Sequence, residues 1–400
     1  MEKTLLNIAL ILIFTKIGGL ISKKFKMPEV LGALIAGVIL GPMILNLVHY
    51  DENIKLLSNI GVILLMFLAG IETNVNEFKK SGLSSLIIAI MGIILPLILG
   101  TLSAYIFFDN FWENVLIGVI LTATSVSITV QTLTELGKLN TKAGINILGA
   151  AVIDDILGLI LISVVLTLAQ TNAPVSAASS TTIILLLTFA KISVFCIASV
   201  LAVIYLPKHI KKFSKNIKPR RSVLTFSIAC ALLIAYLAEF LGIAGITGAY
   251  ICGLIVSSLQ YKEYLDRRIK AISSGFLSLI FFASVGLEAN LTGLNSKVIL
   301  ITIVMFVIAV LGKVLGCGIS AKMLKMSKSE SLQIGVGMIS RGEVAIITSN
   351  ICLQKGLISE EVFLPTLIVV ILTTIITPIL LKISFSHKNE KLINNNPQNS

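Results

Sequence analysis

Two neighbouring carboxylates in the middle of an apolar run are the most chemically informative feature of this sequence. Asp154 and Asp155 lie within the run from Ala151 to Gly158, and Lys313 lies within another apolar run. An isolated charge is costly in hydrocarbon, so ionisable residues inside such runs are functional candidates. Burial disfavours the charged form of a carboxylate or an amine, whereas attraction between the two favours it. The three residues are therefore candidates for a site that binds and releases protons.

Hydroxyl side chains gather in the stretch from Thr122 to Thr129, which includes Thr124 and Ser125. Hydroxyl and β-branched residues at this density are typical of a helix that is locally unwound, whose freed carbonyl groups we expect to face the aspartates. A hard cation such as Na⁺ prefers oxygen ligands, and hydroxyls and free carbonyls supply them. The alternative is ordinary hydroxyl packing between helices.

A second polar motif, Ser340-Arg341-Gly342-Glu343, interrupts another apolar run. We expect a second helix break around Gly342, because charged residues and a glycine replace the apolar pattern there. Arg341 and Glu343 then support the ion site, or they neutralise each other and the helix ends at the break. Lys313 has a comparable alternative, in which its side chain reaches along the helix towards the membrane surface.

The composition indicates that these residues lie in a membrane protein. Of the 400 residues, 56% are hydrophobic and 13% are charged, and the mean hydropathy is +0.98. A soluble domain of this size could not bury so much apolar surface in one core. The net charge of +12 comes from short basic clusters between apolar runs, so no nucleic-acid partner is expected. The five cysteines lack metal-binding spacing and are interpreted as packing residues.

The apolar runs predict an all-α integral membrane protein with about thirteen transmembrane helices. Their approximate ranges are 4–22, 29–48, 54–72, 82–107, 112–137, 141–168, 181–206, 221–241, 244–259, 266–291, 297–321, 330–353 and 361–384. Alternate connections carry the basic clusters, from Lys23 to Lys26 onwards. The positive-inside rule then predicts that the amino terminus is outside and the carboxyl terminus cytoplasmic.

The polar runs predict an inverted repeat. The fourth to sixth predicted helices hold the hydroxyl stretch and the aspartates, and the eleventh to thirteenth hold Lys313 and the second motif. These triplets are seven helices apart, and an odd offset reverses their direction across the membrane. At 1.5 Å per residue, Asp154 lies roughly 18 Å from Lys142 along its helix, and Lys313 roughly 14 Å from Lys322. Both therefore reach the middle of the bilayer, where we expect them to pair.

We expect a single transmembrane domain over residues 1–385, with core helices at about 82–168 and 297–384, and a short polar cytoplasmic tail at 386–400. This tail is too short for a nucleotide-binding domain, and none is expected in the chain. The chemistry is competition between a cation and protons for the same oxygens. It predicts a secondary transporter, not an enzyme, that needs no cofactor beyond the transported Na⁺ and H⁺.

At these residues the sequence resembles the monovalent cation:proton antiporter superfamily, in its bacterial NapA/GerN-like branch with two adjacent aspartates. The resemblance covers about residues 5 to 384. The motifs that carry it keep their order along the chain, and they are Met27 to Gly32, Leu40 to Pro42, Gly61 to Glu72, Ala151 to Gly158, Phe281 to Gly286 and Ser340 to Glu343.

The resemblance implies a fold with two crossing broken helices, a moving core domain, alternating access, a homodimer and a place in the bacterial inner membrane. It implies that Asp155 is the principal carrier of the cation and the proton, and that Asp154 is the partner of Lys313. The positions that it implies line or support the site are Thr124, Ser125, Glu343 and Arg341.

Three other functions have to be weighed. A passive cation channel could use the same carboxylates, but the sequence lacks a TVGYG-like filter. An aspartyl protease needs two carboxylates that converge on one water, which adjacent residues on one helix do not do. A sodium-coupled solute symporter of similar fold stays open. The sequence favours exchange of a monovalent cation for protons, and leaves Na⁺, Li⁺ and K⁺ as candidates.

Overall fold

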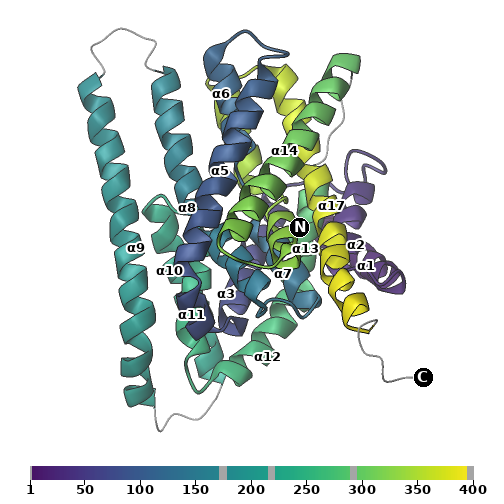
Figure 1. The fold of residues 1–400 in the computed structure, drawn as a ribbon. Helices are drawn as coiled ribbons and strands as arrows, with labels where there is room; N and C mark the ends of the chain where they lie inside the picture. Colours follow the sequence, from purple (N-terminus) through teal and green to yellow (C-terminus); the bar gives the residue numbers. More distant parts are fainter. Residues whose placement is uncertain (1, 171–177, 215–220, 289–294, 394–400) are drawn as a thin grey trace. The chain divides into compact units, whose positions relative to one another are not determined.

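The computed structural model describes residues 2–170, 178–214, 221–288 and 295–393 (Figure 1). Within these ranges every regular element is a helix, as the sequence predicts. In chain order they are α1 (Glu2–Lys24), α2 (Glu29–Leu40), α3 (Glu52–Glu72), α4 (Val75–Lys80), α5 (Gly82–Ala104), α6 (Phe111–Ile120), α7 (Val126–Glu135), α8 (Lys142–Gln170), α9 (Ala178–Ser214), α10 (Arg221–Phe240), α11 (Gly245–Ser257), α12 (Lys262–Ile272), the π-helical turn η2 (Ser273–Leu277), α13 (Ser278–Leu287), α14 (Ser296–Met323), α15 (Lys328–Gly337), α16 (Glu343–Gln354) and α17 (Glu360–Ile393).

Nine helical segments in the described ranges are long and apolar enough to cross a membrane. They include the continuous run through α12, η2 and α13, which the sequence predicts as one span. Four shorter apolar helices add to these nine, and they fall in the predicted spans 29–48, 112–137, 244–259 and 330–353. The multispanning character is therefore confirmed, whereas the exact number of spans is not.

Three predicted spans differ from the observed helices. The helix predicted at 29–48 is wrong in its second half, because α2 ends at Leu40. Gly41 precedes Pro42, and a residue before proline is disfavoured in the helical conformation. The spans predicted at 112–137 and 330–353 are each two short helices separated by a break. These two breaks are the features that position the candidate site.

The chain folds into two compact units. The first comprises Met1–Lys16, Ala36–Lys80 and Asp155–Glu288, and the second comprises Ile17–Ile35, Ser81–Asp154 and Ala289–Ser400. In the first unit α3 is the central helix and packs against α10, α11, α12, η2 and α13. A Cβ added at Gly70 of α3 would lie 2.3 Å from the Tyr250 carbonyl oxygen of α11. The absence of a side chain there lets the two backbones touch.

In the second unit α14 is the central helix and packs against α5, α15 and α17. Figure 1 shows α5 and α14 running side by side. Glycines again permit the close approach, since a Cβ at Gly316 would lie 2.6 Å from the Met91 carbonyl oxygen, and one at Gly312 would lie 3.0 Å from the Pro96 Cα. The close packing brings α5 against the face of α14 that carries Lys313.

We predict that Gly70→Ala lowers the melting temperature of the detergent-purified protein, because the new methyl group forces α3 and α11 apart. Overpacking of this kind costs about 1 to 3 kcal/mol. Gly158→Ala is the matched control, because nothing lies within 4 Å of a Cβ built at Gly158 of α8. Alanine is the better helix former, so this control should be unchanged or stabilised. Equal melting temperatures for both variants would contradict the packing described.

Candidate functional site

A buried ion pair joins α8 to α14. The Lys313 Nζ donates to Asp154 Oδ1 at 3.0 Å and to Asp154 Oδ2 at 3.1 Å. The exposed fractions are 0% for Lys313 and 2% for Asp154, so the lysine does not reach the membrane surface. Gly92 of α5 lies next to the pair and permits close packing there, because a Cβ at Gly92 would lie 2.6 Å from the Cys317 Sγ of α14. The structure thus brings together the acid and the base that the depth calculation predicts to meet.

Asp155 follows Asp154 on α8 and is also buried, with 7% of its surface exposed. Successive side chains on a helix point about 100° apart. Asp155 therefore points in a different direction from the carboxylate that holds Lys313. The two aspartates can have different roles although they are adjacent in sequence.

The first helix break is shorter than the sequence predicts. α6 ends at Ile120 and α7 begins at Val126, so Thr124 and Ser125 lie in the break. Ser127 and Thr129, which the predicted unwound stretch includes, are helical. The Thr124 and Ser125 side chains are buried, with 3% and 8% exposed. The Thr124 Oγ1 has no hydrogen-bond partner among the described residues.

The second break lies directly against the first. The Ser125 N–H donates to the Ser340 carbonyl at 2.8 Å, and the Ser340 hydroxyl donates to the Ser125 carbonyl at 2.9 Å. The Thr129 hydroxyl donates at 2.8 Å to the carbonyl of Gly337, which is the last residue of α15. Three carbonyls and one N–H near the breaks are therefore hydrogen-bonded across the crossing, as buried backbone groups require.

Glycine is needed where the two breaks touch. A Cβ added at Gly342 would lie 2.8 Å from both the Cβ and the Oγ of Ser125. Real Cβ atoms essentially never come so close, so a larger residue at Gly342 would push the breaks apart. The crossing of the two broken helices therefore depends on this glycine.

Arg341 satisfies backbone carbonyls at the second break. Its guanidinium donates to the carbonyls of Met338 at 3.4 Å, Ile339 at 2.9 Å and Ala309 at 3.0 Å, and the residue is 1% exposed. A cation at the carboxyl end of α15 also complements the helix dipole. Of the two roles considered from the sequence, these contacts fit the one in which Arg341 satisfies the helix ends at the break. Glu343 begins α16, but its side chain lies outside what the structure describes.

Sequence reasoning overlooked two residues of α17 that contact the second break. The Thr373 hydroxyl accepts from the Arg341 N–H at 3.2 Å, and the Thr374 hydroxyl donates to the Arg341 carbonyl at 2.8 Å. The available signal was the pair of adjacent threonines inside the apolar run 361–384. It is the same kind of signal as the hydroxyl stretch at the first break, but no charged residue marks it.

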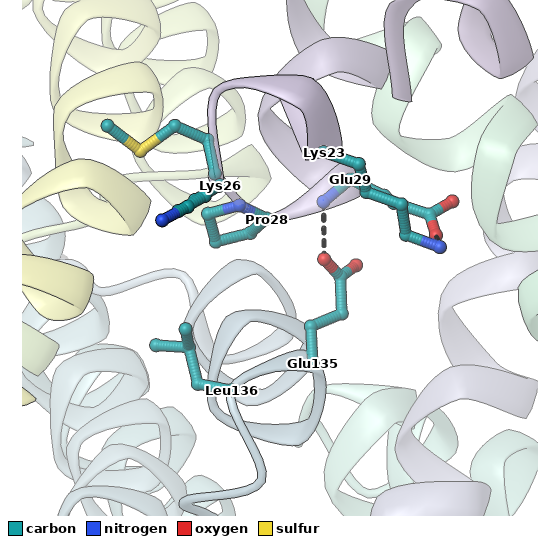
Figure 2. Close-up of a pocket in the computed structure, with 7 residues that line it drawn as sticks. Lys23, Lys26, Pro28, Glu29, Glu135 and Leu136 are labelled. Carbon is teal, nitrogen blue, oxygen red and sulfur yellow. Dashed lines mark hydrogen bonds and ion pairs between the residues drawn. The ribbon is translucent and has the colours of Figure 1, made fainter. Parts of the chain in front are cut away.

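A separate polar pocket of about 370 Å³ lies at the far end of α7 and contains none of the predicted site residues. Figure 2 shows the Glu135 carboxylate pointing at the start of α2, where it accepts from the Glu29 N–H. Lys23 forms an ion pair with Glu29. The Glu135 carboxylate is thus the cap of another helix, and it complements the positive end of the α2 dipole.

The ligands that these buried residues could offer a cation are oxygen atoms. In the described part of the chain no three His, Cys, Asp or Glu side chains come together in a way that could hold a metal ion. Asp154 and Asp155 of α8 are buried carboxylates, and the first break holds the buried hydroxyls of Thr124 and Ser125. Oxygen ligands of this kind fit a hard cation.

Comparison with known proteins agrees with this chemistry. A family model described as "Sodium/hydrogen exchanger, transmembrane" matches residues 9–385. The chain is 38% identical to the Na(+)/H(+)-K(+) antiporter GerN of Bacillus cereus, over 96% of this chain and 97% of that protein. It is 36% identical to a Na(+)/H(+) antiporter of Enterococcus hirae, over 94% of this chain and 96% of that protein.

A solved structure shares the fold. The sodium proton antiporter MjNhaP1 from Methanocaldococcus jannaschii superposes with a TM-score of 0.73, covering 100% of this chain and 99% of that one. The sequences are 17% identical, so this likeness concerns the fold alone. The resemblance inferred from the motifs is confirmed by the family model and by the two relatives.

Breaking the ion pair from one side is expected to destabilise the protein strongly. Asp154→Leu leaves the Lys313 ammonium buried without its carboxylate, which costs roughly 3 to 5 kcal/mol in such sites. Adding Lys313→Leu removes both charges and should recover most of the loss. Thermal unfolding in detergent compares the single and double variants. An Asp154→Leu variant as stable as the parent would show that the pair is not closed in solution.

Proposed function

The chain belongs to the sodium/hydrogen exchanger family, and on this premise we propose that it exchanges a monovalent cation for protons across the membrane by alternating access. The observation that carries the proposal is the Asp154–Lys313 pair, closed at 3.0 Å and buried beside a second aspartate. Na⁺ is the first candidate substrate, and Li⁺ and K⁺ are the others. The chain acts as a transporter and needs no cofactor.

Asp155 is the residue that we assign as the carrier. Its carboxylate is buried, and a buried carboxylate binds either a proton or a cation because either one neutralises its charge. Asp154 is held by Lys313 and is less available. When the cation enters, it displaces the proton from Asp155, and exchange follows without any covalent step.

Thr124 is the hydroxyl best suited to complete the cation site. Its Oγ1 is buried and has no hydrogen-bond partner within the described ranges, so it can turn a lone pair towards an ion. The backbone of Ser125 is already engaged by Ser340, so Ser125 would contribute its side-chain oxygen. Arg341 and Glu343 support the site without binding the ion.

We propose that Lys313 is a second proton carrier. If cation binding draws Asp154 away, the Lys313 ammonium loses its partner in a low-dielectric interior, and this favours loss of its proton. One proton from Asp155 and one from Lys313 would then leave for each monovalent cation bound. Such a cycle moves net charge and responds to voltage by about 2.3 kcal/mol per charge per 100 mV.

The membrane topology that we propose has about thirteen spans, the amino terminus outside and the carboxyl terminus in the bacterial cytoplasm. Two inverted repeats of three spans form the core. The first repeat is α5, the broken span α6 with α7, and α8, and the second is α14, the broken span α15 with α16, and α17. In support of the repeat, α5 packs on α6 as α14 packs on α15, and both second members end in a break. A homodimer is the expected assembly.

The function is tested in proteoliposomes with an imposed pH gradient and an interior pH indicator. We predict that adding Na⁺ collapses the gradient, whereas choline does not, and that Li⁺ and K⁺ added in turn rank the substrates. Asp155→Asn removes the carrier charge without removing volume, so it should fold and form the same oligomer but show no exchange. Normal sodium-dependent proton flux in Asp155→Asn would overturn the assignment of the carrier.

The role of Lys313 is tested with Lys313→Gln, which deletes the second titrating group but keeps a hydrogen-bond donor for Asp154. We predict that the parent protein responds to membrane potential clamped with valinomycin and potassium, and that Lys313→Gln exchanges without responding. Voltage-independent exchange by the unaltered protein would refute the second proton.

A further inference from the structure

The second break frees the backbone groups of Arg341, and both of these groups are held by α17. The Arg341 N–H donates to the Thr373 Oγ1 at 3.2 Å, and the Arg341 carbonyl accepts from the Thr374 hydroxyl at 2.8 Å. The exposed fractions of Thr373 and Thr374 are 0% and 1%. Two adjacent threonine side chains of α17 therefore bind the backbone N–H and the carbonyl of one residue in the break.

The two hydroxyl groups have complementary hydrogen-bonding roles, since that of Thr373 accepts from Arg341 and that of Thr374 donates to it. The Thr373 hydroxyl donates its proton within α17, at 2.8 Å to the Val369 carbonyl and 3.0 Å to the Val370 carbonyl. A hydroxyl has one donor and two lone pairs, so an oxygen lone pair remains to accept the Arg341 N–H. Thr374 instead gives its only proton to the Arg341 carbonyl. The two threonines thus provide the acceptor and the donor that the Arg341 backbone needs.

The position of the Arg341 backbone, which α17 holds, also affects the first break through Ser340. Ser340 precedes Arg341, and its carbonyl and hydroxyl bind the N–H and the carbonyl of Ser125. Ser125 follows Thr124, the residue with the unpaired buried hydroxyl. A shift of the Arg341 backbone would therefore displace Ser340 and, through two hydrogen bonds, the oxygens beside Thr124.

We propose that Thr373 and Thr374 are positioning residues that set the cation affinity of the site without touching the ion. The inference rests on the cation site assigned above, which it extends to α17. A rigid oxygen cage binds an ion more tightly than one that must be ordered on binding, because ordering the ligands opposes binding. Loosening the break should therefore weaken cation binding and leave the chemistry of the aspartates intact.

Thr366 of α17 provides the matched control. It is also buried, at 2% exposed, and its hydroxyl donates to the Val362 carbonyl of its own helix at 2.9 Å. Thr366→Val removes a threonine hydroxyl from the same helix without touching the break. Thr374→Ser is the second control, because it keeps the hydroxyl that donates to Arg341.

The test measures the Michaelis constant for Na⁺ in proteoliposomes and the Na⁺ concentration that gives half of the maximal thermal stabilisation in detergent. We predict that Thr374→Val raises both by about fivefold or more, the effect of losing one buried hydrogen bond, with a maximal rate within about twofold of the parent. Thr374→Ser and Thr366→Val should keep parental values. Thr373→Val, which removes the acceptor of the Arg341 N–H, should act like Thr374→Val.

Three outcomes overturn the inference. The first is an unchanged Na⁺ dependence in both valine variants of the pair, and the second is an equal change in Thr366→Val. The third is failure of both Thr373→Val and Thr374→Val to fold while Thr366→Val folds, which makes the threonines a requirement of the fold. The binding measurement separates this inference from the proposed exchange. Na⁺-dependent stabilisation that shifts in Thr374→Val, in a protein that exchanges no protons, would sustain the positioning role and reject the exchange.

Discussion

The structure depends on one constraint, which is that an ammonium group and a carboxylate group are kept away from water in an apolar interior. Lys313 and Asp154 can be buried there only because each neutralises the other at 3.0 Å. Beside the pair α5 packs closely on α14 at Gly92, where a side chain would collide with Cys317. Asp155, the next residue, is also buried and points in a different direction.

The two helix breaks follow from the same constraint. A transported ion needs oxygen ligands inside the bilayer, and unwound backbone supplies them at the cost of unsatisfied N–H and carbonyl groups. Here Ser125 and Ser340 bind each other across the breaks, and Thr373 and Thr374 of α17 bind the N–H and the carbonyl of Arg341. Arg341 neutralises the carboxyl end of α15. The Thr124 hydroxyl at the first break has no hydrogen-bond partner among the described residues, so it is a candidate for contact with the ion.

The sequence predicts the parts of this arrangement that depend on composition along one helix. Apolar runs locate the spans, the depth calculation pairs Asp154 with Lys313, and the density of hydroxyls locates the first break. The sequence does not predict contacts that depend on how the helices pack against one another. The bond from Thr374 to Arg341 joins residues that are 33 positions apart, and no local pattern indicates it. Gly41 and Pro42 indicate that α2 ends at Leu40, but the apolar residues after Pro42 led to the prediction of a longer helix.

The central claim is that the cation and the protons compete for the same buried carboxylates. It is tested most directly by adding Na⁺ to the detergent-purified protein in weakly buffered solution and measuring the protons released. Thermal stabilisation in parallel reports whether Na⁺ is bound. We predict that protons appear as Na⁺ binds, with the same dependence on Na⁺ concentration, and that Asp155→Asn releases none. Saturable stabilisation by Na⁺ with no release of protons from the parent protein would contradict it.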